Sequence, residues 1–312
     1  MHQVITIGSA LVDIFIHSPQ FVPTKSKQGD LLCQLYGDKT EVDGFNVFTG
    51  GGGSNTAAGF ARLGFKTAIM CETGRDGFAR LVMQDFQDQQ VSTQLVIEEK
   101  KEQTGGSVIL VGPDGERTVL VHRGAASMLD PFDVSAYWLS EARHVHLSSL
   151  GGQRPTLEKI FKLVARNPDL SLSWNPGKKE LALLANRQLV PIDIPCQVFI
   201  VNQAEWKIVS DIQEDILNAF NHVVVTAAGN GGDIYHQGEH LGHYSALSTS
   251  IVDTTGAGDS FAVGYVAGIL WGRKPELAAE YGAKNAASVV AYYGAKTGLL
   301  YQEDLLAKKI KN

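Results

Sequence analysis

The sequence predicts an α/β fold built on a doubly wound, mostly parallel sheet. From about residue 143, strand-like and helix-like segments alternate steadily, as in a parallel sheet with crossover helices. The short apolar run at 4–8 ends at a glycine and suits a buried parallel strand. With 312 residues, 44% of them hydrophobic, the chain can form a single domain over 1–312 with a sizeable core. Strands are expected at 4–8, 145–147, 170–174, 198–201 and 223–226, and helices at 57–64, 79–89, 261–271 and 283–292.

Charge and cysteine content argue against several classes of protein. The formal net charge is -6 and the pI is about 5.8, so there is no basic footprint for nucleic acid or an anionic membrane. Cys33, Cys71 and Cys196 show neither CxxC spacing nor even pairing, which favours reduced thiols. The chain runs directly into a strand-like segment, and no apolar run reaches membrane-spanning length. We expect a cytoplasmic protein with a small-molecule ligand and no nucleic-acid or membrane partner.

A glycine-rich turn at 253–261, Asp-Thr-Thr-Gly-Ala-Gly-Asp-Ser-Phe, precedes an apolar helix-like run. Glycines let successive backbone N–H groups converge, and the helix dipole adds positive potential, so the turn can hold an anion such as a phosphate. Asp259 would then lie beside the anion, close enough to take a proton from a hydroxyl that attacks a phosphoryl group. The alternative is an ordinary helix entry in which Asp259 is a capping residue.

Two stretches near the N-terminus carry candidate ligands for a polyhydroxylated substrate. Four glycines at 50–53 precede Asn55. They are either a flexible hinge or a site of close backbone approach, with Asn55 offering both a donor and an acceptor to hydroxyl groups. Asp13 is a lone carboxylate within the apolar segment 10–16. Its carboxylate either is hydrogen bonded within the protein, at a strand edge or a turn, or accepts hydrogen bonds from the hydroxyl groups of a substrate.

Polar residues follow two of the later strands, at the edge of the sheet where ligands bind. Asn202-Gln-Ala-Glu205 comes after the strand at 198–201, and it also fits a helix capping box. The stretch 226–232, Thr-Ala-Ala-Gly-Asn-Gly-Gly, comes after the next strand, and its backbone can approach a nucleotide.

The two glycine stretches, in this order, resemble the signatures of the PfkB (ribokinase-like) carbohydrate kinase family, and the resemblance covers essentially the whole chain. It implies a three-layer αβα fold and a kinase that uses ATP and Mg²⁺. The implied catalytic groups are Asp259, as the base, and the backbone at Gly256, Ala257 and Gly258. The implied acceptor ligands are Asp13, Gly51, Gly52 and Asn55. The implied nucleotide ligands are Asn202, Glu205, Thr226, Gly229 and Gly231, of which Glu205 holds Mg²⁺ largely through water.

The chain departs from the family pattern at several positions. The nucleotide loop has Ala228 where the family has glycine, which leaves its nucleotide contacts open. Ribokinases proper carry a lysine and a glutamate where this chain has Gly52 and Ser148, so ribose is a less favoured substrate. In relatives, residues that match Asp253 and Thr255 help to bind K⁺ with the peptide around 294–295. In this chain Gly298 stands where relatives often have a serine ligand. The equal alternative to a K⁺ site is that Asp253 serves only as a cap or as an ion-pair partner.

Two β segments, at about 17–49 and 105–123, are expected to form a small lid over the substrate, as in the family that they resemble. The stretch 31–35 alternates like a strand, and 112–116 joins 107–111 to 117–121 in a hairpin pattern. A homodimer could form through such a lid.

The sequence therefore predicts transfer of the γ-phosphoryl group of ATP to a primary hydroxyl of a small sugar or sugar-like molecule. A nucleoside kinase of the adenosine type is the alternative, followed by a non-catalytic sugar or nucleotide sensor on the same fold. A nicotinamide-dependent oxidoreductase would need Gly-x-Gly-x-x-Gly after the first strand, and a P-loop NTPase would need Gly-x-x-x-x-Gly-Lys-Ser/Thr. The sequence contains neither motif at the required place.

Overall fold

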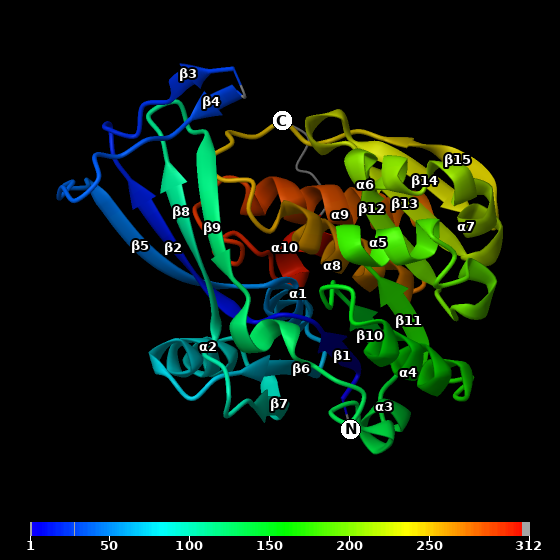
Figure 1. Cartoon of the computed structure of the whole chain (residues 1–312). Coiled ribbons are helices and arrows are strands. Elements are labelled where there is room, and N and C mark those ends of the chain that lie inside the picture. The colour runs from blue at the N-terminus through cyan, green and yellow to red at the C-terminus, as the bar shows by residue number, and fades with distance from the viewer. Residues whose placement is uncertain (1, 28, 308–312) are drawn as a thin grey trace.

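A computed structural model describes residues 2–27 and 29–307 of the chain. These residues form a nine-stranded sheet, a four-stranded sheet and a two-stranded sheet (Figure 1). The strands of the large sheet, in spatial order, are β15 (Glu239–Tyr244), β14 (Gly232–His236), β13 (His222–Thr226), β12 (Val198–Asn202), β11 (Ser171–Trp174), β10 (His144–Leu147), β1 (Val4–Ile7), β6 (Thr67–Thr73) and β7 (Ser92–Glu98). Neighbouring strands are parallel from β13 to β7, whereas β14 and β15 are antiparallel. Because chain order reverses at β1, the predicted doubly wound, mostly parallel sheet is confirmed.

All five predicted strands of this sheet are present, each with ends within one residue of the expected ones. They are almost entirely buried because helices cover both faces, as parallel strands require. The antiparallel ladder of β14 and β15 is an extension of the sheet for which no strand was expected.

Helices cover the large sheet on both faces and complete the three predicted layers. One face packs against α1 (Gly52–Arg62), α2 (Gly77–Asp88), α8 (Ala257–Leu270), α9 (Pro275–Val289) and α10 (Gln302–Leu306). The other face packs against α3 (Ala136–Ser140), α4 (Arg154–Ala165), α5 (Lys178–Ala185), α6 (Gln203–Ile208) and α7 (Gln213–Ala219). Within the described ranges, no helix combines the length and the apolarity needed to cross a bilayer.

The four-stranded sheet stands beside this body (Figure 1). Its strands, in spatial order, are β5 (Gly44–Gly50), β2 (Leu11–His17), β8 (Gly105–Val111) and β9 (Arg117–His122). The predicted hairpin is present, with Val111 opposite Arg117. The predicted lid segments began at about residue 17, and one expected strand is absent from the described residues. The segment 11–17 also belongs to this sheet, since β2 pairs with both β5 and β8. The expected strand at 31–35 does not form; the short hairpin there is β3 (Thr24–Ser26) with β4 (Gly29–Leu31).

Helices α8 and α9 pack closely because glycines remove side chains from their contact. A Cβ atom at Gly264 of α8 would lie 2.6 Å from the carbonyl oxygen of Tyr281 and 2.8 Å from Cα of Gly282. Helix α9 also begins earlier than the expected residue 283, since Pro275 occupies its first turn, where a missing N–H costs nothing.

We predict that Gly264→Ala destabilises the protein by about 1–3 kcal/mol, because the added methyl group must push two backbones apart. The matched control is Gly77→Ala in α2, where the new Cβ would meet only the Arg80 side chain, at 3.6 Å. Urea unfolding monitored by circular dichroism measures both. Equal stability of Gly264→Ala and the wild type would show that the helices can separate without cost.

Candidate active site

The anion-binding turn begins at Gly256, which adopts a left-handed conformation (φ 78°) and precedes the first residue of α8. A Cβ atom there would lie 2.4 Å from Cβ of Ala295, so only glycine fits. Gly258 faces open space, and Ala257 and Gly258 both line a cavity. The N–H of Ala257 donates to the carbonyl oxygen of Thr254 at 3.3 Å, and the N-terminal end of α8 borders the cavity, as expected for an anion site.

Asp259 lies in the first turn of α8 but makes no capping bond there. Its Oδ2 atom instead accepts a hydrogen bond of 2.7 Å from Nδ2 of Asn55, a residue of α1. Burial raises the pKa of the Asp259 carboxyl, while the bond from Asn55 and the positive charge of Lys296 act in the opposite direction. The alternative in which Asp259 is only a helix cap is therefore wrong.

The glycine at 52 keeps side-chain atoms out of the narrow space between Asp259 and Ser148. A Cβ atom at Gly52 would lie 3.0 Å from Cβ of Ser148 and 3.6 Å from Oδ1 of Asp259. Gly51 has φ 96° and would clash with the backbone of Ser9 if it carried a side chain. Among the described residues, Oδ1 of Asn55 and the Ser148 hydroxyl are buried and have no hydrogen-bond partner. The structure thus places unpaired polar atoms around this space, where a hydroxylated molecule can bind them.

Asp13 lies on β2 and is 8% exposed. Its side chain contacts the position that a Cβ of Gly50 would occupy and is hydrogen bonded to Ser107. Burial raises the pKa of this carboxyl, and Lys296 opposes the shift. Asp13, Gly51, Gly52, Asn55 and Asp259 all belong to segments that meet at the junction of β2, β5, α1 and α8.

Lys296 is a buried cation at this junction that was not predicted from the sequence. Its Nζ atom donates to Asp85 at 2.5 Å, to Ser54 at 2.6 Å and to Thr49 at 3.0 Å. Burial lowers the pKa of the Lys296 amine, and Asp85 opposes this shift. The only sequence signal was a lone lysine directly after Gly294 and Ala295.

Asn202 and Glu205 form the capping box that the sequence allows, with reciprocal bonds of 2.9 Å at the start of α6. Burial raises the pKa of the Glu205 carboxyl; Asp259 adds to this shift and Lys178 opposes it. Among the described residues, no group of three His, Cys, Asp or Glu side chains could hold a metal ion. A carboxylate close to a second carboxylate suits Mg²⁺ that is bound largely through water and phosphate oxygens.

A cavity of about 590 Å³ connects the later candidate residues. Asn202, Thr226, Gly229 and Gly231 line it together with Ala257 and Gly258 of the anion turn. The small residues Ala283, Ala286 and Ala287 of α9 form another wall. In the loop after β13, Ala228 has φ 48°, a conformation that normally favours glycine. The chain thus keeps a left-handed turn at the position where the family pattern has glycine.

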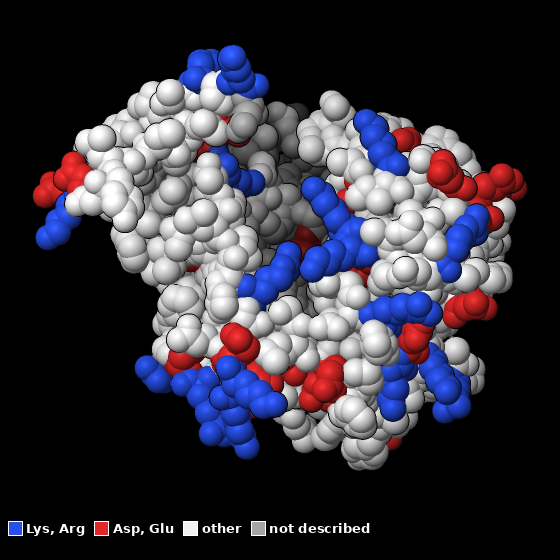
Figure 2. All heavy atoms as spheres, in the orientation of Figure 1, with Lys and Arg blue, Asp and Glu red and all other residues white. Residues whose placement is uncertain are grey.

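Asp253 and Thr255 lie together as expected, but their partner is an arginine. The Asp253 carboxylate accepts hydrogen bonds from Thr255 N (2.9 Å), Thr255 Oγ1 (2.7 Å) and Gly294 N (3.1 Å). The guanidinium of Arg117, from β9, is bonded to Asp253, Thr254 and Thr255. Figure 2 shows a hollow between the four-stranded sheet and the body, with Lys and Arg side chains along its rim.

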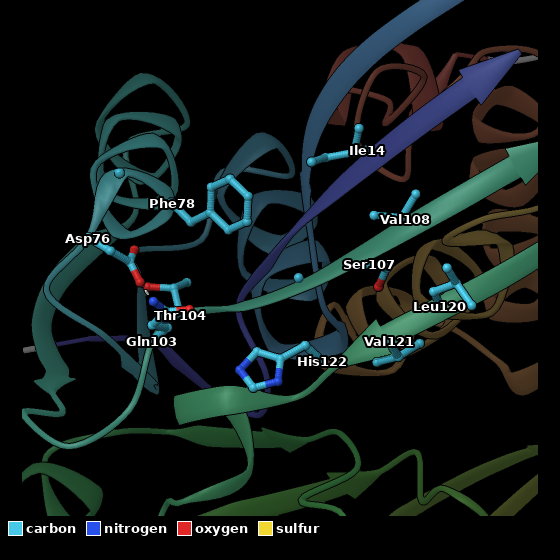
Figure 3. Close-up of a pocket in the computed structure, with 12 residues that line it drawn as sticks. Ile14, Asp76, Phe78, Gln103, Thr104, Ser107, Val108, Leu120, Val121 and His122 are labelled. Atoms are coloured by element: carbon cyan, nitrogen blue, oxygen red, sulfur yellow. Dashed lines mark hydrogen bonds between the residues drawn. The ribbon is translucent and has the colours of Figure 1, made fainter. Parts of the chain in front are cut away.

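Another cavity, of about 670 Å³, lies between α2 and the four-stranded sheet (Figure 3). Phe78 faces Ile14 and Val108 across it. Ile14 and Val108 lie on the opposite face of the sheet from Asp13, since side chains alternate along a strand. Ser107, the hydrogen-bond partner of Asp13, also lines this cavity.

Comparisons with known proteins agree with this geometry. The chain is 25% identical to the ATP-dependent 6-phosphofructokinase of Thermoanaerobacterium thermosaccharolyticum, over 94% of this chain and 89% of that protein. It is also 25% identical to the ribokinase of Staphylococcus aureus, over 97% and 98% of the two chains. The crystal structure of a Cryptococcus neoformans ribokinase in complex with ADP superimposes with a TM-score of 0.76 at 22% identity, covering 98% of this chain and 99% of that chain. A model of the pfkB family of carbohydrate kinases matches residues 1–300. The chain therefore belongs to the pfkB carbohydrate kinase family and is a phosphotransferase with an alcohol group as acceptor.

Proposed function

We propose that this protein transfers the γ-phosphoryl group of ATP to a primary hydroxyl group of a small sugar or sugar-like molecule. The observation that carries the proposal is the position of Asp259. Its carboxylate lies at the N-terminal end of α8, is held by Asn55, and borders the space beside Gly52. A hydroxyl group in that space would meet a base on one side and an anion-binding turn on the other.

In this mechanism Asp259 accepts the proton of the attacking hydroxyl. Its raised pKa makes it a better base than an exposed aspartate. The hydrogen bond from Asn55 keeps one carboxylate oxygen fixed, so that the other faces the acceptor. The backbone N–H groups at Gly256, Ala257 and Gly258 stabilise the charge on the transferred group. When bound, Mg²⁺ would neutralise the leaving phosphates, and Glu205 is the residue that would hold it, through water.

The cavity lined by Asn202, Thr226, Gly229 and Gly231 is the proposed nucleotide site. It opens onto Ala257 and Gly258, so that bound phosphates reach the anion turn. Its other walls are small or apolar and suit a flat base, and the related C. neoformans structure contains ADP. The lining of this cavity and the ADP in the related structure both support ATP as the phosphoryl donor.

Asp13, Gly51, Gly52, Asn55 and Ser148 form the proposed acceptor site, with the four-stranded sheet as its lid. Unpaired polar atoms on Asn55 and Ser148 favour an acceptor with several hydroxyl groups. The same cradle could accept the ribose of a nucleoside, so an adenosine-type kinase is the second candidate. The opposite face of the lid exposes Phe45 (63%) and Leu120 (59%), and a homodimer through this face stays a prediction.

The proposal is tested by measuring ATP consumption across sugars, sugar acids, sugar phosphates and nucleosides. Asp259→Asn provides the control, because the amide keeps the shape of the side chain and cannot accept the proton. With the best acceptor, we expect its turnover number to fall about 10²–10⁴-fold, with nucleotide affinity unchanged. Near-normal turnover by purified Asp259→Asn would remove Asp259 from the role of base.

The same variant tests the electrostatic cost of the site. Burial raises the folded-state pKa of Asp259, so its charged form is disfavoured in the folded protein. We predict that Asp259→Asn is more stable than the wild type at neutral pH. The difference should shrink as the pH falls through the folded-state pKa towards the ordinary aspartate value of 3.8, because the wild-type carboxyl then becomes protonated. Thermal unfolding at a series of pH values measures this. A difference that does not change with pH would contradict the assigned cause.

A further inference from the structure

Arg117 reaches from the lid sheet to the loop that carries the anion turn. It is the first residue of β9, directly after the hairpin turn. In the register of the sheet it lies opposite Val111, on the same face as Ser107 and Asp13. Its side chain is 33% exposed, whereas the Asp253 side chain that it contacts is 2% exposed. One end of this ion pair, Arg117, therefore belongs to the lid, and the other end, Asp253, belongs to the buried segment that leads into the anion turn.

The guanidinium occupies the oxygens that a monovalent cation would need. It contacts Asp253 and the hydroxyl groups of Thr254 and Thr255, the last at 3.2 Å. The remaining contacts of the Asp253 carboxylate are backbone N–H groups and the Thr255 hydroxyl, which are donors. A potassium ion at Asp253 and Thr255 would lie against a fixed positive charge. The residues therefore do not fit K⁺ while Arg117 is in place.

We infer that Arg117 is a tethered cation that replaces a monovalent ion at Asp253 and thereby positions the anion turn when the lid is closed. This inference rests on the proposed kinase function. The planar guanidinium suits the task, because it binds a carboxylate and two hydroxyl groups at once. Arg117 is thus a positioning residue, which acts through Asp253 on the turn that begins at Gly256.

Other contacts place the lid against the same strip of the body. A Cβ atom at Gly294 would lie 2.8 Å from the ring of Phe48 on β5, and Gly294 is also the residue whose N–H donates to Asp253. The ring of His17 on β2 packs edge-on against Tyr293, with 4.9 Å between ring centroids. If the lid opened, Arg117 would leave Asp253 as a buried charge without its partner, which is strongly unfavourable. Lid closure and the geometry of the turn are therefore linked.

The test compares the wild type with Arg117→Met, which removes the charge, and with Arg117→Lys, which keeps the charge without the planar fork. Arg187→Met is the matched control, because Arg187 forms an exposed ion pair with Asp215. Turnover is measured with the best acceptor while K⁺ replaces tetramethylammonium at constant ionic strength. Two readouts need no activity. One is the thermal unfolding midpoint with and without K⁺, and the other is hydrogen exchange of residues 253–258.

The expected result is a wild-type enzyme whose turnover and unfolding midpoint do not respond to K⁺. Arg117→Met should show faster exchange at 253–258 and about tenfold to a hundredfold lower turnover, with less effect on KM, because the turn is misplaced. Potassium should raise both its turnover and its unfolding midpoint. Arg117→Lys should fall between the two, and Arg187→Met should behave like the wild type.

Activation of the wild type by K⁺ as strong as that of Arg117→Met would overturn the inference. So would an Arg117→Met protein whose unfolding midpoint does not respond to K⁺, or whose exchange at 253–258 matches the wild type. If no acceptor supports ATP consumption by the wild type, the proposed function fails. The unfolding and exchange measurements then still decide whether Arg117 replaces a cation.

Discussion

The hydrogen bond between Asn55 and Asp259 joins the first turns of two helices that are far apart in the chain. The site depends on this contact, because it fixes the proposed base relative to the glycine cradle. Glycines of α1 allow this close packing against its neighbours. Gly53 lies directly against Gly8, where a Cβ would be 2.6 Å from a backbone carbon, and Gly59 packs on Val263 of α8. Glycine thus serves here for close approach of backbones rather than for flexibility.

Bringing these helices together also concentrates negative charge. Asp13, Asp253 and Asp259 are carboxylates close enough to influence one another or a common lysine. The positive charge of Lys296 opposes the rise in the pKa of Asp13 and of Asp259, and Arg117 is paired with Asp253. The two cations offset part of the repulsion among the carboxylates, so that the protein can fold with an acidic site. Burial still raises the pKa of Asp259, which favours its role as a proton acceptor.

The parts of the fold and site that sequence could predict are those encoded locally. The parallel strands follow from short apolar runs, and the glycine turns at 50–53 and 256–258 are contiguous motifs. Arg117 and Lys296 could not be predicted, because their partners lie 136 and 211 residues away in the sequence and become neighbours only after folding. The predicted lid did not include 11–16 for a related reason. Its apolar pattern suits either sheet, and only its pairing with β5 and β8 decides between them.

The central claim is that the acceptor hydroxyl lies in the space between Gly52, Ser148 and Asp259. Gly52→Ala tests it most directly, because the new methyl group would enter that space, 3.0 Å from Cβ of Ser148 and 3.6 Å from Oδ1 of Asp259. The measurement is steady-state kinetics with the best acceptor, with nucleotide affinity as the check that the fold is retained. The account predicts a KM for the acceptor that rises, or a turnover that falls, by about tenfold or more, with nucleotide affinity unchanged. Wild-type kinetics in Gly52→Ala would contradict it, since the acceptor would then have to bind elsewhere.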